Sequence, residues 1–237
     1  MVEILNETEA RVIGSLVEKQ LTTPEYYPLT LNALVNACNQ KNNREPQMSV
    51  TPDAVESALE SLRLSGAVAE IQGAGRVSKY RHFLYEWLGV EKFEMAVMAE
   101  LLLRGDQTIG ELRGRAARME PIAGLEELKP ILKSLLAKNL IVSLTPEGRG
   151  QAVTHNLYKD REINEIKAHY AAQAAQAPTH SSAAGDDGVA PSPVSTRSPT
   201  SRSVSSRDGE IDELRRDVAL LREEVSALRD QIEQLKG

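Results

Sequence analysis

A helix followed by a two-stranded hairpin occurs twice in this chain of 237 residues, and this repeat limits the possible folds more than any other feature. In the first copy, Thr51-Pro52 marks the start of the helix, because Thr is a favoured N-cap and Pro is tolerated in the first turn. Gly66 marks its end. The segments Ala67–Ile71 and Val77–Phe83 flank a glycine-containing turn, which predicts a hairpin.

The second copy lies 73 residues further along the chain. This shift pairs Leu59 with Leu132 and His82 with His155. The helices that open the two units align instead with a shift of 85 residues, so the first unit has about a dozen extra residues around its LTTPEYYPLT segment. Two copies of a helix–helix–helix–hairpin unit predict two tandem winged helix-turn-helix domains. The expected fold class is α+β with mostly α structure.

Apolar residues at helical spacing predict the remaining helices. These are Leu5–Gln20, Leu31–Asn43, Glu91–Arg104, a short helix from Thr108 to about Met119, and Leu125–Asn139. A capping box, formed by Thr108 and Glu111, marks the start of the short helix. Pro130 indicates that the last of these helices starts late or is kinked. An alanine-rich segment, Asp160–Ala175, predicts one further helix.

The C-terminal part of the chain changes composition twice. Residues 171–209 are rich in Ser, Pro, Ala and Gly, which predicts a disordered linker. Residues 210–237 form four heptads with β-branched residues at every a position and Leu at every d position, a pattern that favours a parallel two-stranded coiled coil. The predicted dimerisation residues are Ile211, Leu214, Val218, Leu221, Val225, Leu228, Ile232 and Leu235. We therefore predict a homodimer with winged-helix domains at 1–87 and 88–170.

Composition excludes several classes of protein. The 28 basic and 34 acidic side chains give a net charge of −6, so the chain is not a strongly basic nucleic-acid binder. Cys38 is the only cysteine, which excludes an intrachain disulfide and a cysteine-rich zinc site. The N-terminal residues show no secretory signal, and no apolar run reaches the roughly 18 residues of a membrane span. We expect a cytoplasmic protein with no membrane partner.

The segment LTTPEYYPLTLNALVNACNQKNNREP, residues 21–46, resembles the YceH family of bacterial proteins. The resemblance includes the Gly66–Tyr85 hairpin and covers roughly residues 3–158. It implies two tandem winged-helix domains and says little about activity. The second hairpin, TPEGRGQAVTHNLY, departs from the family pattern, and the linker and coiled coil lie outside the shared region.

A winged helix places its third helix in the major groove of double-stranded DNA, which makes DNA a candidate partner. The third helix of the first unit, however, is expected to expose Asp53, Glu56 and Glu60 together with two serines, and carboxylates repel phosphate. Candidate nucleic-acid-binding residues therefore lie elsewhere, or these residues are ordinary solvated side chains. They are Lys41, Asn42, Asn43, Arg44, Arg76, Lys79, Arg81, Arg113, Arg115, Arg118, Lys129, Lys133 and Arg149.

Four amides form a stripe along the predicted second helix, and two explanations compete for them. They are Asn32, Asn36, Asn39 and Asn43. Asn side chains read adenine edges in DNA, but they also bond backbone groups of irregular loops. We favour the second explanation, with the Leu21–Leu29 loop as the partner. Tyr26 and Tyr27 likewise either stack on bases or anchor this loop, and anchoring is favoured.

No catalytic motif is recognisable. The glycines at 73 and 75 join two strands and open no helix, so they are not a phosphate-binding loop. The four histidines show no metal-ligand spacing, and Cys38 lies on an apolar helix face. We expect no enzymatic activity, cofactor or metal. The leading hypothesis is a homodimeric, transcription-regulator-like DNA-binding protein, and the alternative is a protein–protein interaction adaptor that uses its winged-helix surfaces.

Overall fold

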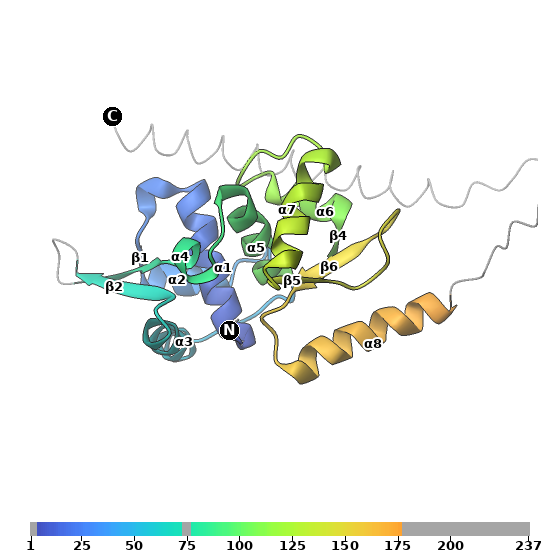
Figure 1. Ribbon diagram of the computed structural model, residues 1–237. Helices are drawn as coiled ribbons and strands as arrows, with labels where there is room; N and C mark the ends of the chain where they lie inside the picture. Colours follow the sequence, from blue (N-terminus) through green and yellow to red (C-terminus); the bar gives the residue numbers. More distant parts are fainter. Residues whose placement is uncertain (1–3, 73–76, 177–237) are drawn as a thin grey trace, which may run out of the picture. The chain divides into compact units, whose positions relative to one another are not determined.

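The computed structural model describes residues 4–72 and 77–176, all within the first of the two units of the chain, Met1–His180 (Figure 1). The predicted coiled coil, and the predicted linker from residue 177 onward, lie outside the described residues. Two lobes make up the described part. We call residues 4–90 lobe 1 and residues 91–158 lobe 2; a last helix follows lobe 2.

The fold is mostly helical α+β, with one small antiparallel sheet in each lobe. Lobe 1 consists of α1 (Glu7–Thr22), η1 (Pro24–Tyr26), β1 (Leu29–Thr30), α2 (Leu31–Cys38), α3 (Pro52–Leu64), β2 (Val68–Gln72), β3 (Ser78–His82) and α4 (Leu84–Leu88). Lobe 2 consists of α5 (Lys92–Arg104), β4 (Gln107–Thr108), α6 (Ile109–Ala116), α7 (Leu125–Ala137), β5 (Ile141–Ser143) and β6 (Ala152–His155). The last helix is α8 (Asp160–Gln176), which continues past residue 170, the predicted end of the second domain.

Apart from η1 and α4, which belong to lobe 1 alone, the two lobes repeat the same order of helices and strands. The sheet orders are β1-β3-β2 and β4-β6-β5, so the second hairpin strand is central in both. Val68 pairs with His82 in lobe 1, and Ile141 pairs with His155 in lobe 2, which is the predicted shift of 73. The repeat inferred from the sequence is therefore present in the backbone hydrogen bonds.

The extra residues of lobe 1 lie in two places. A shift of 85 places Glu7 on Lys92, at the starts of α1 and α5. The starts of α2 and α6 differ instead by 78, and those of α3 and α7 by 73. One insertion thus precedes β1 and another separates α2 from α3. The prediction of a single insertion around LTTPEYYPLT was wrong, because the second insertion has no sequence signal of its own.

Local capping explains where several helices begin. The side chain of Asn6 accepts from Glu9 N, and Glu9 bonds back to Asn6 N, so α1 starts at Glu7. The predicted capping box of Thr108 and Glu111 is confirmed. Pro130 lies inside α7, whose start at Leu125 shows that this helix does not begin late.

The helix α2 ends at Cys38, earlier than the predicted Asn43. Two buried arginines bond its last carbonyls: Arg44 Nε donates to Ala37 O at 3.1 Å and Arg11 Nη1 donates to Cys38 O at 3.3 Å. Carbonyls at a helix end need such donors, since no later turn supplies them. The chain therefore leaves the helix and continues as an irregular segment, residues 39–51.

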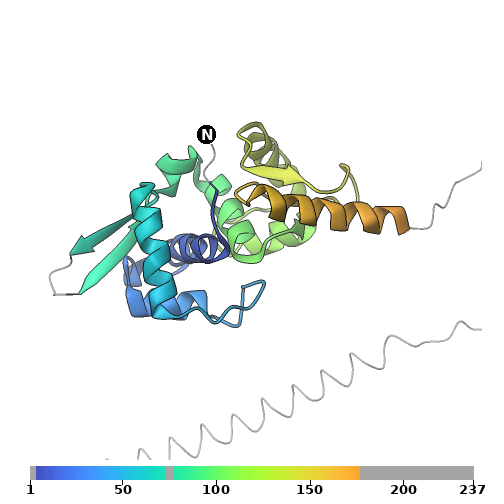
Figure 2. The same cartoon turned by 90° about the horizontal axis from the view of Figure 1, so that it is seen from below.

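The first helices of the two lobes pack against each other and form the centre of the molecule (Figures 1 and 2). Both are buried around their whole circumference, over Glu9–Glu18 in α1 and Glu94–Leu103 in α5. They approach closely at Gly14, where an added Cβ would lie 3.0 Å from Leu103 Cγ. The lobes are also joined by Leu5 N, which donates to Leu157 O at 2.8 Å.

The two repeated histidines, His82 and His155, each bond the backbone at the end of a hairpin strand. His82 Nδ1 accepts from Leu84 N at 3.2 Å, and His155 Nδ1 accepts from Leu157 N at 3.3 Å. Burial lowers the pKa of His82 to about 4, with a further contribution from the Arg81 charge, and burial lowers the pKa of His155 to about 3. Both rings are therefore neutral in the folded protein at neutral pH.

Candidate functional site

Arg44 is buried, so its prediction as a candidate nucleic-acid-binding residue was wrong. Only 2% of the residue is accessible, and its guanidinium forms a bidentate ion pair with Glu18, with Nη2 2.5 Å from Oε2. Arginine is favoured in buried pairs because its planar fork matches a carboxylate. Sequence reasoning missed this pair because Glu18 is 26 residues away, on α1, whereas Arg44 lies in the irregular segment after α2.

A chain of buried and half-buried charges extends from this pair across the contact between the lobes. Glu18 also bonds Arg118 of lobe 2, whose Nη2 lies 3.0 Å from Glu100 Oε2. Glu100 Oε1 lies in turn 2.9 Å from Arg104 Nε. Burial alone would raise the pKa of Glu18, but the bonds and charges of Arg44 and Arg118 outweigh it, and the pKa lies below its usual value. These residues join the lobes, and Arg44 and Arg118 are not available to a ligand.

Other candidate cations are also held by neighbours. Arg113 donates to the carbonyls of Ile122 and Ala123, and Arg115 bonds Gln107 and Glu111. Lys129 pairs with Glu126, and the Arg81 guanidinium lies 4.5 Å from the centre of the Phe83 ring. Asn43, in a left-handed conformation, accepts from Arg104.

The remaining candidates are scattered over the surface. Lys41 and Asn42 lie in the segment after α2, Lys79 on β3, Lys133 on α7, and Arg149 in the loop between β5 and β6. Arg76 lies outside the described residues. The two hairpins project in opposite directions (Figures 1 and 2), so Lys79 and Arg149 do not belong to one patch. The structure does not bring the predicted residues together into one basic surface.

The prediction that the amide stripe bonds the Leu21–Leu29 loop was wrong. Asn39 bonds both backbone groups of Val50, each at 2.8 Å, and so closes the segment after α2. Asn32 and Asn36 are exposed. Tyr27 does anchor its loop, since its hydroxyl accepts from His82 N at 2.7 Å, but Tyr26 is exposed.

A groove of about 760 Å³ lies in lobe 1 between α2, α3 and the β2–β3 hairpin. Three carboxylates line it, from Glu56 and Glu60 on α3 and from Glu70 on β2, and Arg63, the one lining cation among the described residues, pairs with Glu70 at 2.9 Å. We call this feature the α3 groove. The predicted acidic exposed face of α3 is confirmed, because Asp53, Glu56 and Glu60 are all exposed.

The α3 groove also has apolar walls. Leu31, Leu59 and Tyr80 line it, and Val77 at the hairpin is 62% exposed. Burial raises the pKa of Tyr80, and the nearby Glu70 and Glu56 charges raise it further. A carboxylate rim over apolar walls suits a ligand that carries both positive charge and hydrocarbon. The alternation of β2 already places Glu70 outward, but its position opposite α3 depends on tertiary packing.

Residues 5–151 match the family described as "Protein of unknown function, DUF480". The chain belongs to this family. The UPF0502 protein RB6530 of Rhodopirellula baltica is 49% identical over 195 residues, which cover 78% of this chain and 82% of the relative. A UPF0502 protein of Pelobacter propionicus is 41% identical over 234 residues, which cover 97% of this chain and 99% of the relative.

The DUF480 match covers all of lobe 1 after Leu5 and ends immediately before β6 of lobe 2. The alignment with the Pelobacter relative extends over nearly the whole chain, including the segment after α8. Within the described ranges of this DUF480 protein, no cluster of three or more potential metal ligands occurs, and no helix has the length and apolar character needed to cross a bilayer.

Proposed function

We propose that this DUF480 protein is a non-enzymatic, tandem winged-helix protein that binds another protein through the α3 groove. The repeated helix–strand–helix–helix–strand–strand order supports the winged-helix assignment of both lobes. The overlap of residues 5–151 with the region that resembles the YceH family supports the view that DUF480 and YceH are one family. A non-enzymatic role fits the neutral, backbone-bonded histidines and the buried Cys38, whose pKa burial raises to about 11.

The acidic face of α3 carries this proposal. In a winged helix, α3 occupies the position of the recognition helix, where DNA binding relies on Lys and Arg that neutralise phosphates. Here Asp53, Glu56 and Glu60 are exposed on that helix, and Glu70 faces it across the groove. A protein segment with Lys or Arg beside an apolar side chain complements both the rim and the walls of the groove.

DNA binding is the second candidate, favoured by the first hairpin. Lys79 and Arg81 on β3 form no ion pair within the described part of the chain. A hairpin with such residues contacts the phosphate backbone in winged-helix complexes. The two candidates predict opposite effects of the α3 carboxylates, which allows one pair of variants to separate them.

Charge reversal in the groove should abolish peptide binding. We expect a fluorescent 12-residue peptide of alternating Lys and Leu to bind the full chain, and Glu56→Lys/Glu60→Lys to weaken it at least about tenfold, measured by anisotropy. The matched control is Glu126→Lys/Glu165→Lys, which makes the same change in net charge at exposed positions outside the groove. Equal weakening by both variants would show that only overall charge matters.

The same proteins distinguish DNA binding. On a labelled mixed-sequence duplex in a salt series, we expect no binding by the wild-type chain and a gain by Glu56→Lys/Glu60→Lys. Wild-type binding that Lys79→Ala/Arg81→Ala weakens, together with no binding of the peptide, would favour the DNA hypothesis and contradict ours.

We further propose that the chain forms a homodimer through residues 210–237. Deletion of this segment should halve the mass measured by light scattering, and Leu221→Pro should act in the same way because proline breaks the helix. Leu221→Met, which keeps an unbranched-β apolar side chain at this d position, is the control and should remain a dimer. A mass unaffected by the deletion would locate self-association elsewhere.

A further inference from the structure

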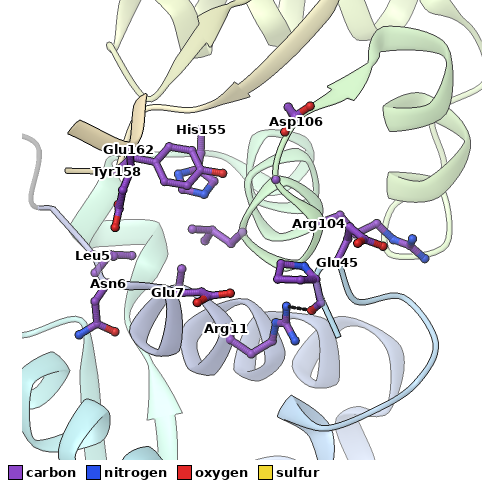
Figure 3. A pocket seen from close by; sticks show the side chains of 14 residues that line it. Leu5, Asn6, Glu7, Arg11, Glu45, Arg104, Asp106, His155, Tyr158 and Glu162 are labelled. Carbon is purple, nitrogen blue, oxygen red and sulfur yellow. Dashed lines mark hydrogen bonds between the residues drawn. The ribbon is translucent and has the colours of Figure 1, made fainter. Parts of the chain in front are cut away.

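A second cavity, of about 360 Å³, lies between the two lobes (Figure 3). Its walls come from the start of α1, the segment after α2, the end of α5 and the segment after β6, and Glu162 of α8 lies at its edge. Figure 3 shows Glu7 and Arg11 on one side, with His155 and Tyr158 opposite. The volume is within the range of small-molecule sites in proteins. The α3 groove is a separate feature.

Arg11 is the unusual residue of this cavity. It is 2% exposed, and its Nη groups donate to the carbonyls of Cys38 and Pro46, while Nε has no hydrogen-bond partner. Among residues 4–72 and 77–176, no carboxylate forms an ion pair with it. A buried cation that forms no ion pair is costly, so an anionic group in the cavity would stabilise it. The other buried arginine of lobe 1, Arg44, has such a partner in Glu18.

Most of the other charged residues that line the cavity are carboxylates, so a ligand with only negative charge does not fit it. Burial lowers the pKa of Arg11, and the nearby charges of Glu7 and Glu45 oppose this effect although neither forms an ion pair with it. Asp106 accepts a hydrogen bond from Tyr170 and Arg104 pairs with Glu100, so these two are already engaged. Glu7 and Glu45 are exposed, and no hydrogen bond to either carboxylate occurs in the described part of the chain. They are suited to a ligand's ammonium group.

Apolar surface completes the cavity. Leu5, Ala10 and Leu102 line it, and the His155 and Tyr158 rings stack with centroids 3.8 Å apart. The His155 ring is neutral, so it adds no charge. A ligand of the right class therefore has a carboxylate, an ammonium group and a small hydrocarbon part.

We propose that the interlobe cavity binds a free amino acid, with the carboxylate at Arg11, the ammonium group between Glu7 and Glu45, and the side chain against Leu5 and Leu102. The two opposite charges of the ligand match the two kinds of charge in the wall. Because residues of both lobes line the cavity, occupancy would tie the lobes together. This proposal does not depend on the function of the α3 groove.

Free L-amino acids are the probes for the test. The full chain is titrated with each of the standard amino acids by calorimetry, and thermal unfolding is followed in parallel, because a ligand that binds only the folded state raises the Tm. We expect at least one apolar amino acid to bind with a Kd below about 1 mM. Absence of binding for all of them at 10-fold that concentration would overturn the proposal.

Ligand analogues test the charge pairing without changing the protein. For the amino acid that binds, N-acetylation removes the ammonium group and decarboxylation removes the carboxylate, and each should weaken binding at least about tenfold. Glu7→Gln/Glu45→Gln should weaken the amino acid to a similar extent, while the control Glu126→Gln/Glu165→Gln should not. Binding that is insensitive to the first variant, or equal for the amino acid and both analogues, would place the ligand elsewhere and contradict the proposal. The last variant is Arg11→Met, which removes the charge assigned to the ligand's carboxylate and should therefore weaken binding. Its circular dichroism is compared with that of the wild type to show that it is folded.

Discussion

Replacing Glu18 with leucine should lower the free energy of unfolding by about 3–5 kcal/mol, the usual cost of removing one partner of a buried ion pair. Glu18 is 3% exposed and bonds both Arg44, whose side chain is fully buried, and Arg118. Without Glu18, the Arg44 guanidinium has no carboxylate partner in the described part of the chain. Urea unfolding of the full chain, followed by circular dichroism, measures the loss as a shift of the midpoint.

The double variant Glu18→Leu/Arg44→Met provides the decisive comparison. It removes both charges and replaces them with apolar groups, so we expect it to recover a large part of the lost stability. Glu126→Leu, which breaks only an exposed pair with Lys129, should change stability by less than about 1 kcal/mol. A Glu18→Leu protein as stable as Glu126→Leu would show that water reaches the buried network.

Stability should also fall by about 4 kcal/mol between pH 7 and pH 5, because His82 and His155 remain neutral in the folded state. Their pKa values are lowered to about 4 and about 3, whereas a histidine in the unfolded chain has a pKa of about 6.5. The unfolded chain therefore binds protons that the folded chain does not, so acid favours unfolding below about pH 6.5. Each ring contributes about 2 kcal/mol over this range.

Urea midpoints measured at pH 7, 6 and 5 test this expectation. His82→Gln and His155→Gln lower stability at every pH, but each should remove about half of the pH dependence, and the double variant most of it. Glu18 acts in a separate pH range. Folding lowers its pKa, so its contribution to stability is lost only as the pH falls below about 4.3, the pKa of a glutamate in the unfolded chain. A full pH dependence in the double histidine variant would assign the effect to other groups.

Features that depend on neighbouring residues along the chain could be predicted from the sequence. The capping box of Thr108 and Glu111 and the apolar face of α3 both rest on contacts within a few residues. The shift of 73 predicted that the two hairpins correspond to each other, and Val68–His82 and Ile141–His155 are indeed equivalent pairs. The acidic face of α3 followed from the same helical period.

Features that depend on distant residues could not be predicted in this way. Arg44 was placed on the surface because a charged residue in a polar loop is normally solvated, and its partner Glu18 belongs to a helix with its own period. The bond from Arg118 to Glu18 joins residues 100 positions apart. The two-residue strands β1 and β4 are too short for a periodic pattern, and both cavities are formed by elements that only tertiary packing brings together.

The directions of the two hairpins limit which targets both lobes could contact at the same time. They extend in opposite directions from the packed helices α1 and α5 (Figures 1 and 2), so the distance between them is fixed by the core of the protein. With a fixed spacing, the effective concentration of the second contact is high for a target whose sites match that spacing and close to zero for one whose sites do not. A target that contacted both hairpins at once would therefore need two sites separated by the spacing that the core sets.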